Sequence, residues 1–196
     1  MTPIRRWMLQ DAYNIKPDVL VLNIDFLLLK SFRERIFNEL DIPPFELDEV
    51  NVNEYRTNWK NVVQHLLGHY KNDRPIYIGL TVSNEWYEGF EENLQLYGLT
   101  YKFKAEVFDV AKVNREIYER YWDLHDINMA HEDYYANSNV ANMNRNYLKP
   151  LKAIYDQYLQ SGESSKASSV RNMAMGIADR TLDERLVNQT DSLFKQ

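Results

Sequence analysis

The sequence contains no cysteine among its 196 residues. This absence excludes disulfide frameworks, thiolate metal sites and cysteine nucleophiles. Long apolar runs are also missing: Val19–Leu29 is interrupted by Asn23 and Asp25, and it is far shorter than the roughly 20 residues that a membrane-spanning helix needs. We therefore expect no membrane insertion by this chain. We also expect no secretion signal, because no apolar stretch with a small-residue cleavage site follows Arg5 and Arg6.

An excess of basic charge is lacking as well. The chain has 23 Lys and Arg against 29 Asp and Glu, which gives a net charge of −6, and the basic residues form no stripe. Attraction to phosphate backbones or anionic lipids therefore has no source, so we expect no nucleic-acid partner. Gly79 and Gly89 do not stand in the spacing of a phosphate-binding loop. We expect no nucleotide and no other cofactor.

What the chain does contain is typical of a folded protein, with 44% apolar and 27% charged residues. Aromatic residues make up 13% of the sequence, and 14 of them are Tyr. Tyrosine suits surfaces where one end of the side chain is packed and the other is wet. This enrichment favours a protein partner or self-association.

The first part of the chain alternates between expected strands and helices. Asp18–Phe26 is apolar on both faces of a pleat, Ile76–Val82 is β-branched and aromatic, and Leu99–Phe108 alternates like an edge strand. The expected helices between and around them are Ser31–Leu40, Glu54–Tyr70 and Ser83–Gly98. Such alternation predicts an α/β fold, with a small Rossmann-like, mostly parallel sheet over residues 1–108.

The pattern after residue 108 is helical only. Expected helices cover Val110–Trp122, Met143–Gln160 and Ser164–Ala178, and Gly162 marks a short turn between the last two. This hairpin has the size of one tetratricopeptide unit, so we expect a tetratricopeptide-like helical portion over residues 109–180.

The apolar face of one such hairpin needs a partner surface. We therefore expect protein binding through its tyrosines, namely Tyr147, Tyr155 and Tyr158. Residues 181–196 are polar, and we expect this tail to fray.

Polar side chains follow two of the expected strands. Asn23 and Asp25 stand at the end of the first, and Thr81 and Ser83 stand at the end of the second. In open α/β sheets ligands bind at the carboxyl ends of the strands, so these four residues are candidate ligand-binding groups. The alternative is that they cap the helices that follow.

Other constellations are less specific. His65 and His69 lie four residues apart on a helix, as two metal ligands could, but no third ligand has a diagnostic spacing, so we predict no metal site. Acidic residues between Glu85 and Glu92 fit a solvated helix face. No catalytic residue is predicted, which leaves enzymatic activity uncertain and disfavours it.

The order of several segments resembles a family of bacterial multi-pass membrane proteins related to protein O-mannosyltransferases. The similar segments are "WMLQDAYNIKPDVLVLN", "RPIYIGLTV", "LQLYGLTYKF" and the helix start Asn144–Tyr147. The resemblance spans about Trp7 to Arg185 and concerns the soluble region that follows the membrane part in that family. Two features of the family are absent from this chain: the strand and "gly-asp-asn-asp-thr" turn that precede the first segment, and the membrane glycosyltransferase part.

The resemblance implies an accessory soluble domain, and it implies a cell-envelope location. No catalytic residue can be carried over from it. We therefore expect a non-catalytic protein-binding or assembly module whose partner is a membrane protein or a second copy. The alternative is a small ligand- or sugar-binding domain, or an enzyme, that uses Asn23, Asp25, Thr81 and Ser83. A third interpretation is a truncated paralogue with a structural role alone.

Overall fold

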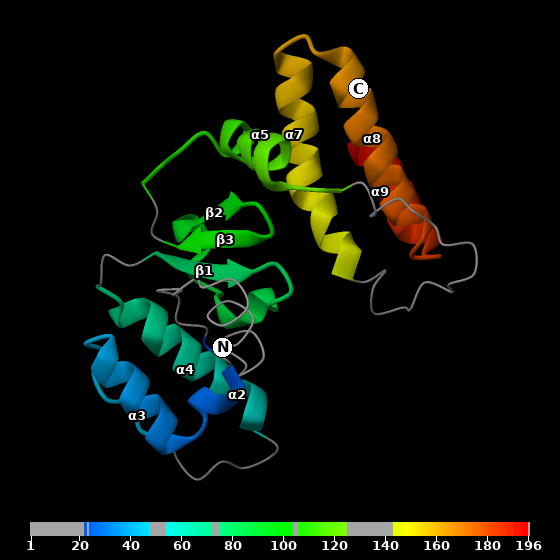
Figure 1. Cartoon of the computed structure of the whole chain (residues 1–196). Coiled ribbons are helices and arrows are strands. Elements are labelled where there is room, and N and C mark those ends of the chain that lie inside the picture. Colours follow the sequence, from blue (N-terminus) through cyan, green and yellow to red (C-terminus); the bar gives the residue numbers. More distant parts are fainter. Residues whose placement is uncertain are drawn as a thin grey trace, which may run out of the picture. The chain divides into compact units, whose positions relative to one another are not determined.

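The computed structural model describes residue 22 and residues 24–47, 54–71, 75–103, 106–124 and 143–195 (Figure 1). These residues are mostly helical, with a small antiparallel sheet. The chain divides into two compact units. Unit 1 contains Met1–Arg74 and Ser83–Gly89, and unit 2 contains Pro75–Val82 and Phe90–Gln196. The division differs from the expected boundary at residue 108, because the strands group with the helices that follow them.

The predicted Rossmann-like parallel sheet is wrong. Strands β1 (Ile76–Gly79), β2 (Leu94–Tyr97) and β3 (Thr100–Phe103) form one sheet in the order β1-β3-β2, and both neighbouring pairs are antiparallel. A parallel pair needs a crossover of a dozen or more residues, whereas only two residues join β2 to β3. One of them, Gly98, has a φ of 58°, which suits such a tight hairpin. β3, expected at an edge, is the central strand.

The helix expected over Ser83–Gly98 is also wrong. Its segment forms two short 3-10 helices, η3 (Asn84–Trp86) and η4 (Glu91–Asn93), followed by β2. Gly89 lies between them with a φ of 87°, which is outside the helical region of the backbone. The apolar spacing along this segment is helical, but one glycine in a left-handed conformation is enough to end a helix.

Unit 1 contains the helices α2 (Ile24–Leu27), α3 (Lys30–Glu39) and α4 (Tyr55–His69). The positions of α3 and α4 confirm the expected helices. The strand expected over Asp18–Phe26 is wrong at its end, because α2 occupies it. Of the remaining positions Leu22 is described and lies in no strand, and the others lie outside the described residues.

A buried arginine joins α2 and α3. Arg33 donates from Nε to the carbonyl oxygen of Phe45 at 2.9 Å, and from Nη1 to the carbonyl oxygens of Leu27 and Leu28 at 3.0 Å each. These two carbonyls lie at the carboxyl end of α2, where helix carbonyls lack intrahelical partners. The guanidinium therefore satisfies them and holds the segment after α3 against the unit.

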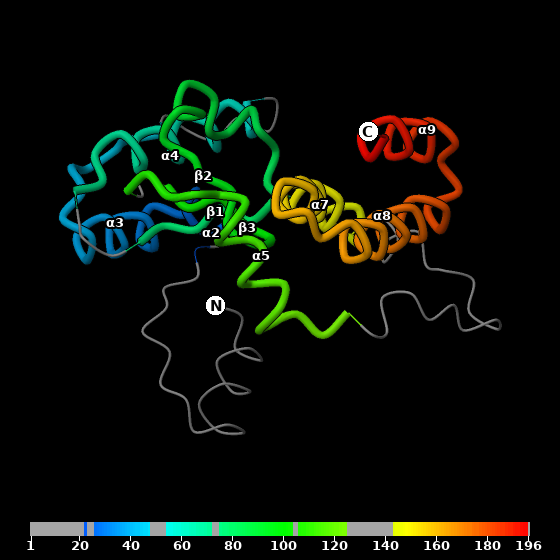
Figure 2. The backbone as a smooth tube through the Cα atoms, turned by 90° about the horizontal axis from the view of Figure 1, so that it is seen from above, coloured from blue at the N-terminus to red at the C-terminus, as the bar shows by residue number. Residues whose placement is uncertain are grey.

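Unit 2 contains α5 (Val110–Tyr121), η6 (Arg145–Tyr147), α7 (Leu148–Gln160) and α8 (Ser164–Asp179). The expected helical hairpin is confirmed as α7 and α8, and α7 also contacts α5 (Figure 2). Gly162, with a φ of 74°, makes the turn between them. The amide of Glu163 donates to the carbonyl of Tyr158 at 2.8 Å, which is the long hydrogen bond of a Schellman-type helix end.

The tail of the chain is not frayed, contrary to our prediction. Asp183 accepts hydrogen bonds from the amides of Arg185 and Leu186 and so caps α9 (Glu184–Leu193), which packs on α8. Phe194, directly after α9, is buried in the core of unit 2. That core comes from the facing sides of α7 and α8 together with this phenylalanine: Leu151, Ile154, Tyr155, Tyr158, Ala167, Val170, Ala174, Ile177 and Phe194.

One buried asparagine joins α5 to the sheet. The Asn114 side chain accepts from the amide of Gly98 at 2.8 Å and donates to the carbonyl of Leu96 at 2.9 Å. It also donates to the carbonyl of Val110 at 2.7 Å. The side-chain amide of Asn114 thus makes hydrogen bonds at the outer edge of β2 that a neighbouring strand would otherwise make.

Candidate functional site

The four predicted ligand-binding residues do not form a site in the described structure. Asn23 lies outside the described residues, and Asp25 lies in helix α2 rather than at the end of a strand. Thr81 and Ser83 are exposed and fall on either side of the boundary between the two units. The argument that placed them together required a parallel sheet, so it does not apply to this antiparallel one.

The three predicted partner-binding tyrosines pack within unit 2. Tyr155 and Tyr158 are buried, and Tyr155 donates from its hydroxyl to the carbonyl of Phe194 at 2.9 Å. Tyr147 is half-buried, with its ring centroid 5.2 Å from that of Trp122. These rings stabilise the unit, so a partner of unit 2 would have to contact other side chains.

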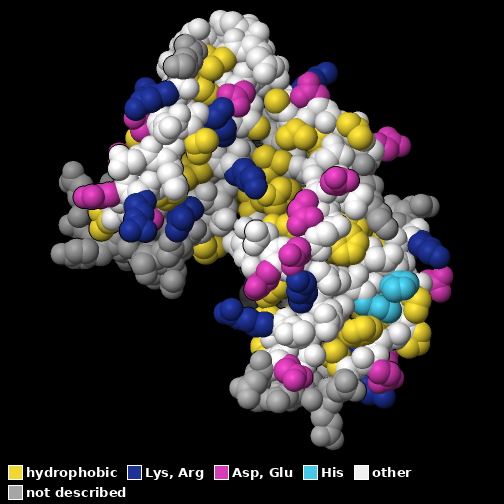
Figure 3. Space-filling view, turned by 180° about the vertical axis from the view of Figure 1, so that it is seen from behind, with side chains coloured by type: hydrophobic (Ala, Val, Ile, Leu, Met, Phe, Trp, Pro, Cys, Tyr) yellow, Lys and Arg dark blue, Asp and Glu magenta, His cyan; other side chains and the backbone are white. Residues whose placement is uncertain are grey.

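The two described histidines lie side by side at the surface, where Figure 3 shows them in cyan. The ring centroids of His65 and His69 are 4.2 Å apart. His65 Nε2 lies 2.9 Å from the carbonyl of Pro43, and His69 Nδ1 lies 2.9 Å from the carbonyl of His65. In each ring, therefore, one nitrogen lies within hydrogen-bond distance of a backbone carbonyl oxygen. Among the described residues, no group of three His, Asp or Glu side chains could hold a metal ion.

A cluster of charged groups joins α5 to the α7–α8 hairpin. Arg115 contacts Glu119 at 3.1 Å and Glu163 at 2.6 Å, and Lys166 contacts Glu163 at 2.7 Å. The hydroxyl of Tyr158 donates to Glu119 Oε1 at 2.9 Å, while the Arg115 guanidinium lies 4.6 Å from the centroid of the Tyr158 ring. Two cations and two anions thus surround one tyrosine.

The pKa shifts in this cluster favour ionised carboxylates, protonated Arg and Lys, and a neutral tyrosine. The Tyr158 hydroxyl lowers the pKa of Glu119, and Lys166 lowers the pKa of Glu163. Hydrogen bonding to Glu163 raises the pKa values of Arg115 and Lys166, and desolvation raises the pKa of Tyr158. A general acid or base needs a pKa near the working pH, and these shifts move every group away from neutrality. The cluster links α5 to the hairpin through ion pairs and one tyrosine hydrogen bond.

Replacing Tyr158 by Phe is expected to raise the pKa of Glu119, because the tyrosine hydroxyl is the largest cause of its lowering. A carboxyl with a lowered folded-state pKa stabilises the fold above its unfolded pKa of about 4.3, and this contribution is lost as the pH falls through the folded value. The variant should therefore lose this contribution at higher pH than the parent protein. Carbon-13 NMR titration of the Glu119 carboxyl measures the shift. An unchanged Glu119 titration would contradict the assigned hydrogen bond, and Asp191 provides an internal control because Lys195, not Tyr158, is the largest cause of its lowered pKa.

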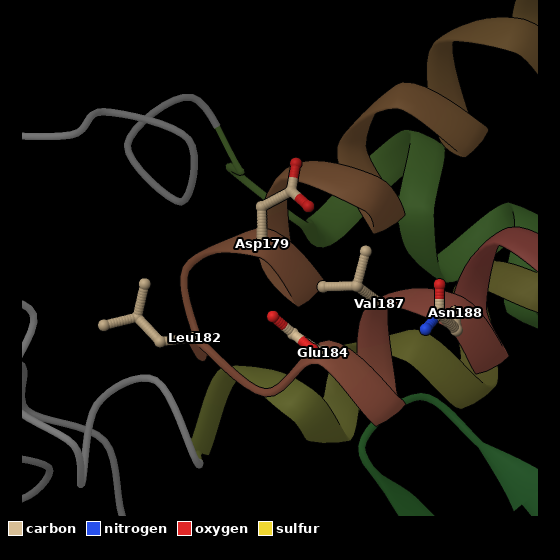
Figure 4. Close-up of a pocket in the computed structure, with 5 residues that line it drawn as sticks. All are labelled: Asp179, Leu182, Glu184, Val187 and Asn188. Carbon is tan, nitrogen blue, oxygen red and sulfur yellow. The ribbon is translucent and has the colours of Figure 1, made fainter.

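A pocket of about 550 Å³ lies at the corner between α8 and α9 (Figure 4). Its described lining contains two carboxylates, one amide and two apolar side chains: Asp179, Glu184, Asn188, Leu182 and Val187. Asp179 ends α8, whereas Glu184, Val187 and Asn188 come from the first turns of α9. In Figure 4, Asp179, Glu184 and Val187 surround a common space, and Leu182 stands apart on the connecting loop.

Leu182 is unusual in both its exposure and its backbone conformation. Its side chain is 91% exposed, and its φ of 55° is one that large apolar residues rarely adopt. The loop is nevertheless held by hydrogen bonds: the amide of Leu182 donates to the carbonyl of Asp179, and the Thr181 hydroxyl donates to the carbonyl of Ala178 at 2.6 Å. Leu182 is therefore an apolar side chain held outward beside the pocket.

Sequence reasoning did not identify this corner. A local signal was present, since Thr181 and Asp183 flank Leu182 in a pattern that is typical of a helix end followed by a new N-cap. The pattern indicates a turn, but a leucine at a turn is buried in many proteins. Its exposure follows only from how α9 packs against α8.

The described helices include none that is long and apolar enough to cross a membrane. The predicted resemblance to mannosyltransferase-related membrane proteins stays a prediction. No family model matches the chain, no curated protein matches it, and no solved structure matches it, so the chain is assigned to no family.

Proposed function

We propose that this chain is a non-catalytic protein-binding module and that unit 2 binds its partner at the corner between α8 and α9. The observation that carries the proposal is Leu182, whose side chain is 91% exposed beside a pocket of about 550 Å³. Anchor side chains in protein interfaces fill pockets on the partner, and an exposed apolar side chain beside a pocket offers both an anchor and a place for one.

The backbone at this corner supports the proposal. A left-handed conformation costs a residue such as leucine about 1–2 kcal/mol, and strained backbone conformations of this kind cluster at functional sites. The other described non-glycine residue with positive φ is Asp41, whose short polar side chain tolerates this region more readily. Among the described residues, none buries the Leu182 side chain to offset this cost, and contact with a partner would supply the missing burial.

The alternative of a small ligand-binding domain or enzyme gains no support from the described residues. Thr81 and Ser83 are exposed, and the most perturbed titratable groups, around Tyr158, belong to a saturated ion cluster. We therefore propose no reaction for this chain.

Site-specific crosslinking in the cells of origin tests the proposal. A p-benzoylphenylalanine placed at Leu182 is expected to form a covalent adduct with one partner, which mass spectrometry identifies and which is then purified for binding measurements. The matched control is Val107 of unit 2, an apolar residue that is 95% exposed but does not line the pocket. Equal capture of the same proteins from both positions would contradict a specific interface.

Leu182→Gly is expected to weaken binding of that purified partner at least about tenfold, since an interface anchor contributes about 1–2 kcal/mol or more. The same change should leave the free energy of unfolding unchanged or raise it by up to about 1 kcal/mol, because glycine accepts a positive φ. Isothermal titration calorimetry and urea unfolding measure the two effects. Unchanged affinity in a folded Leu182→Gly protein would refute the role of this side chain.

A further inference from the structure

We infer that the partner contacts the α8–α9 corner with a basic amphipathic helix, which places an apolar side chain against Leu182 and Val187 and a Lys or Arg between Asp179 and Glu184. The inference rests on the proposed function and adds the chemistry of the partner. It also predicts that the identity of the charges at this corner decides which helices bind.

The charges of the pocket favour a cation. Asp179 and Glu184 both line it, and neither forms an ion pair within the described part of the chain. The carboxylates of the Arg115 cluster, by contrast, are already paired. Asp179 is also the last residue of α8, so the negative end of the helix dipole adds to its charge. The basic residue Arg180 caps this helix end but is not among the described residues that line the pocket.

The backbone of the corner favours a helical partner over an extended one. An added strand needs free amides and carbonyls along an edge, but here the amides that begin α9 donate to Asp183. The carbonyls of Ala178 and Asp179 at the end of α8 accept from Thr181 and Leu182. A helix satisfies its own backbone groups and inserts only side chains, which suits a pocket of about 550 Å³.

The same charges argue against a second copy of this chain as the occupant. A two-fold contact through Leu182 would bring Asp179 and Glu184 of one copy toward the same residues of the other. Like charges brought together at an interface oppose association. A partner with basic residues near its apolar anchor has no such conflict.

Synthetic helices test the inference directly. The first probe is a fluorescein-labelled peptide of about 18 residues, above the length of about 15 at which isolated helices become stable, with Leu and Lys on one face. The second probe replaces every Lys by Glu. Fluorescence anisotropy with the full chain is expected to show about tenfold or more preference for the Lys peptide, lost at high salt.

Reversing the charges of the pocket should reverse this preference. The double variant Asp179→Lys and Glu184→Lys is expected to bind the Glu peptide better than the Lys peptide. Because both residues are exposed, the variant should fold like the parent, and a gain of affinity for one peptide cannot arise from unfolding. The matched control exchanges an exposed carboxylate that does not line the pocket, Glu116→Lys, and should leave the preference unchanged.

The results separate this inference from the proposed function. Equal binding of both peptides, or binding of neither, overturns the basic helix as the occupant. If Leu182 still crosslinks to one partner in that case, the protein-binding function stands with a partner of different chemistry. If Leu182 crosslinks to a second copy of the chain, the argument from like charges fails and the occupant is the protein itself.

Discussion

Replacing Phe194 by Ala is expected to lower the free energy of unfolding by about 3–5 kcal/mol, the usual cost of truncating a buried phenylalanine. Phe194 is 1% exposed and belongs to the core of unit 2, with its ring centroid 5.1 Å from that of Tyr155. Its carbonyl also accepts the hydrogen bond of the Tyr155 hydroxyl at 2.9 Å, so a shift of this backbone would leave a buried hydroxyl without a partner. Urea unfolding followed by circular dichroism measures the loss.

The adjacent residue provides the control for this experiment. Leu193 has its side chain 57% exposed, so Leu193→Ala should change the free energy of unfolding by no more than about 0.5 kcal/mol. Similar small effects of both changes would mean that the tail frays, as the sequence had predicted. A large effect of Phe194→Ala alone would establish the tail as a structural part of unit 2.

Replacing Asn114 by Ala is expected to cost about 3–5 kcal/mol, because it leaves two buried backbone groups without partners, at about 1–3 kcal/mol each, and opens a cavity. The Asn114 side chain is 0% exposed. It accepts from the amide of Gly98 and donates to the carbonyl of Leu96. Chemical denaturation measures the global effect.

Hydrogen exchange gives this prediction a local readout. The Gly98 amide should exchange faster in Asn114→Ala than in the parent protein by more than the global loss of stability explains. Asn172, an exposed asparagine in α8, is the control, and Asn172→Ala should change the free energy of unfolding by less than about 1 kcal/mol. An unchanged Gly98 exchange rate would show that α5 is not tied to the hairpin through this side chain.

Helices with a clear apolar face were predictable from the sequence. The 3.6-residue spacing of Val62, Leu66 and their neighbours predicted α4, and the same spacing predicted α3, α5, α7 and α8. Gly162 correctly predicted the turn of the hairpin, because a positive φ favours glycine at a helix end. β1 was predictable from its β-branched and aromatic residues.

The direction of the strands was not predictable from these local patterns. Alternating apolar residues indicate a strand, but they do not indicate which strand it pairs with or in which direction. Here a two-residue turn containing Gly98 makes β2 and β3 antiparallel. The structure of the segment before β2 was likewise not predictable from its local pattern. Its apolar spacing suits a helix, but Gly89 has a left-handed conformation that interrupts one. The argument for the predicted ligand site depended on the wrong strand direction, so it no longer brings the four residues together.

The sequence by itself determined that this chain has no thiol chemistry and no basic stripe, and it determined where the amphipathic helices lie, because composition and periodicity are properties of the chain alone. Only the tertiary structure decided which side chains are available to a partner. Packing of α7 against α5 and α8 buried Tyr155 and Tyr158, two of the three tyrosines expected to bind a partner. Docking of α9 on α8 buried Phe194, which directly follows α9, because this end of the helix reaches the core between α7 and α8. Leu182 lies at the other end of α9, in the turn that precedes the helix, and stays exposed.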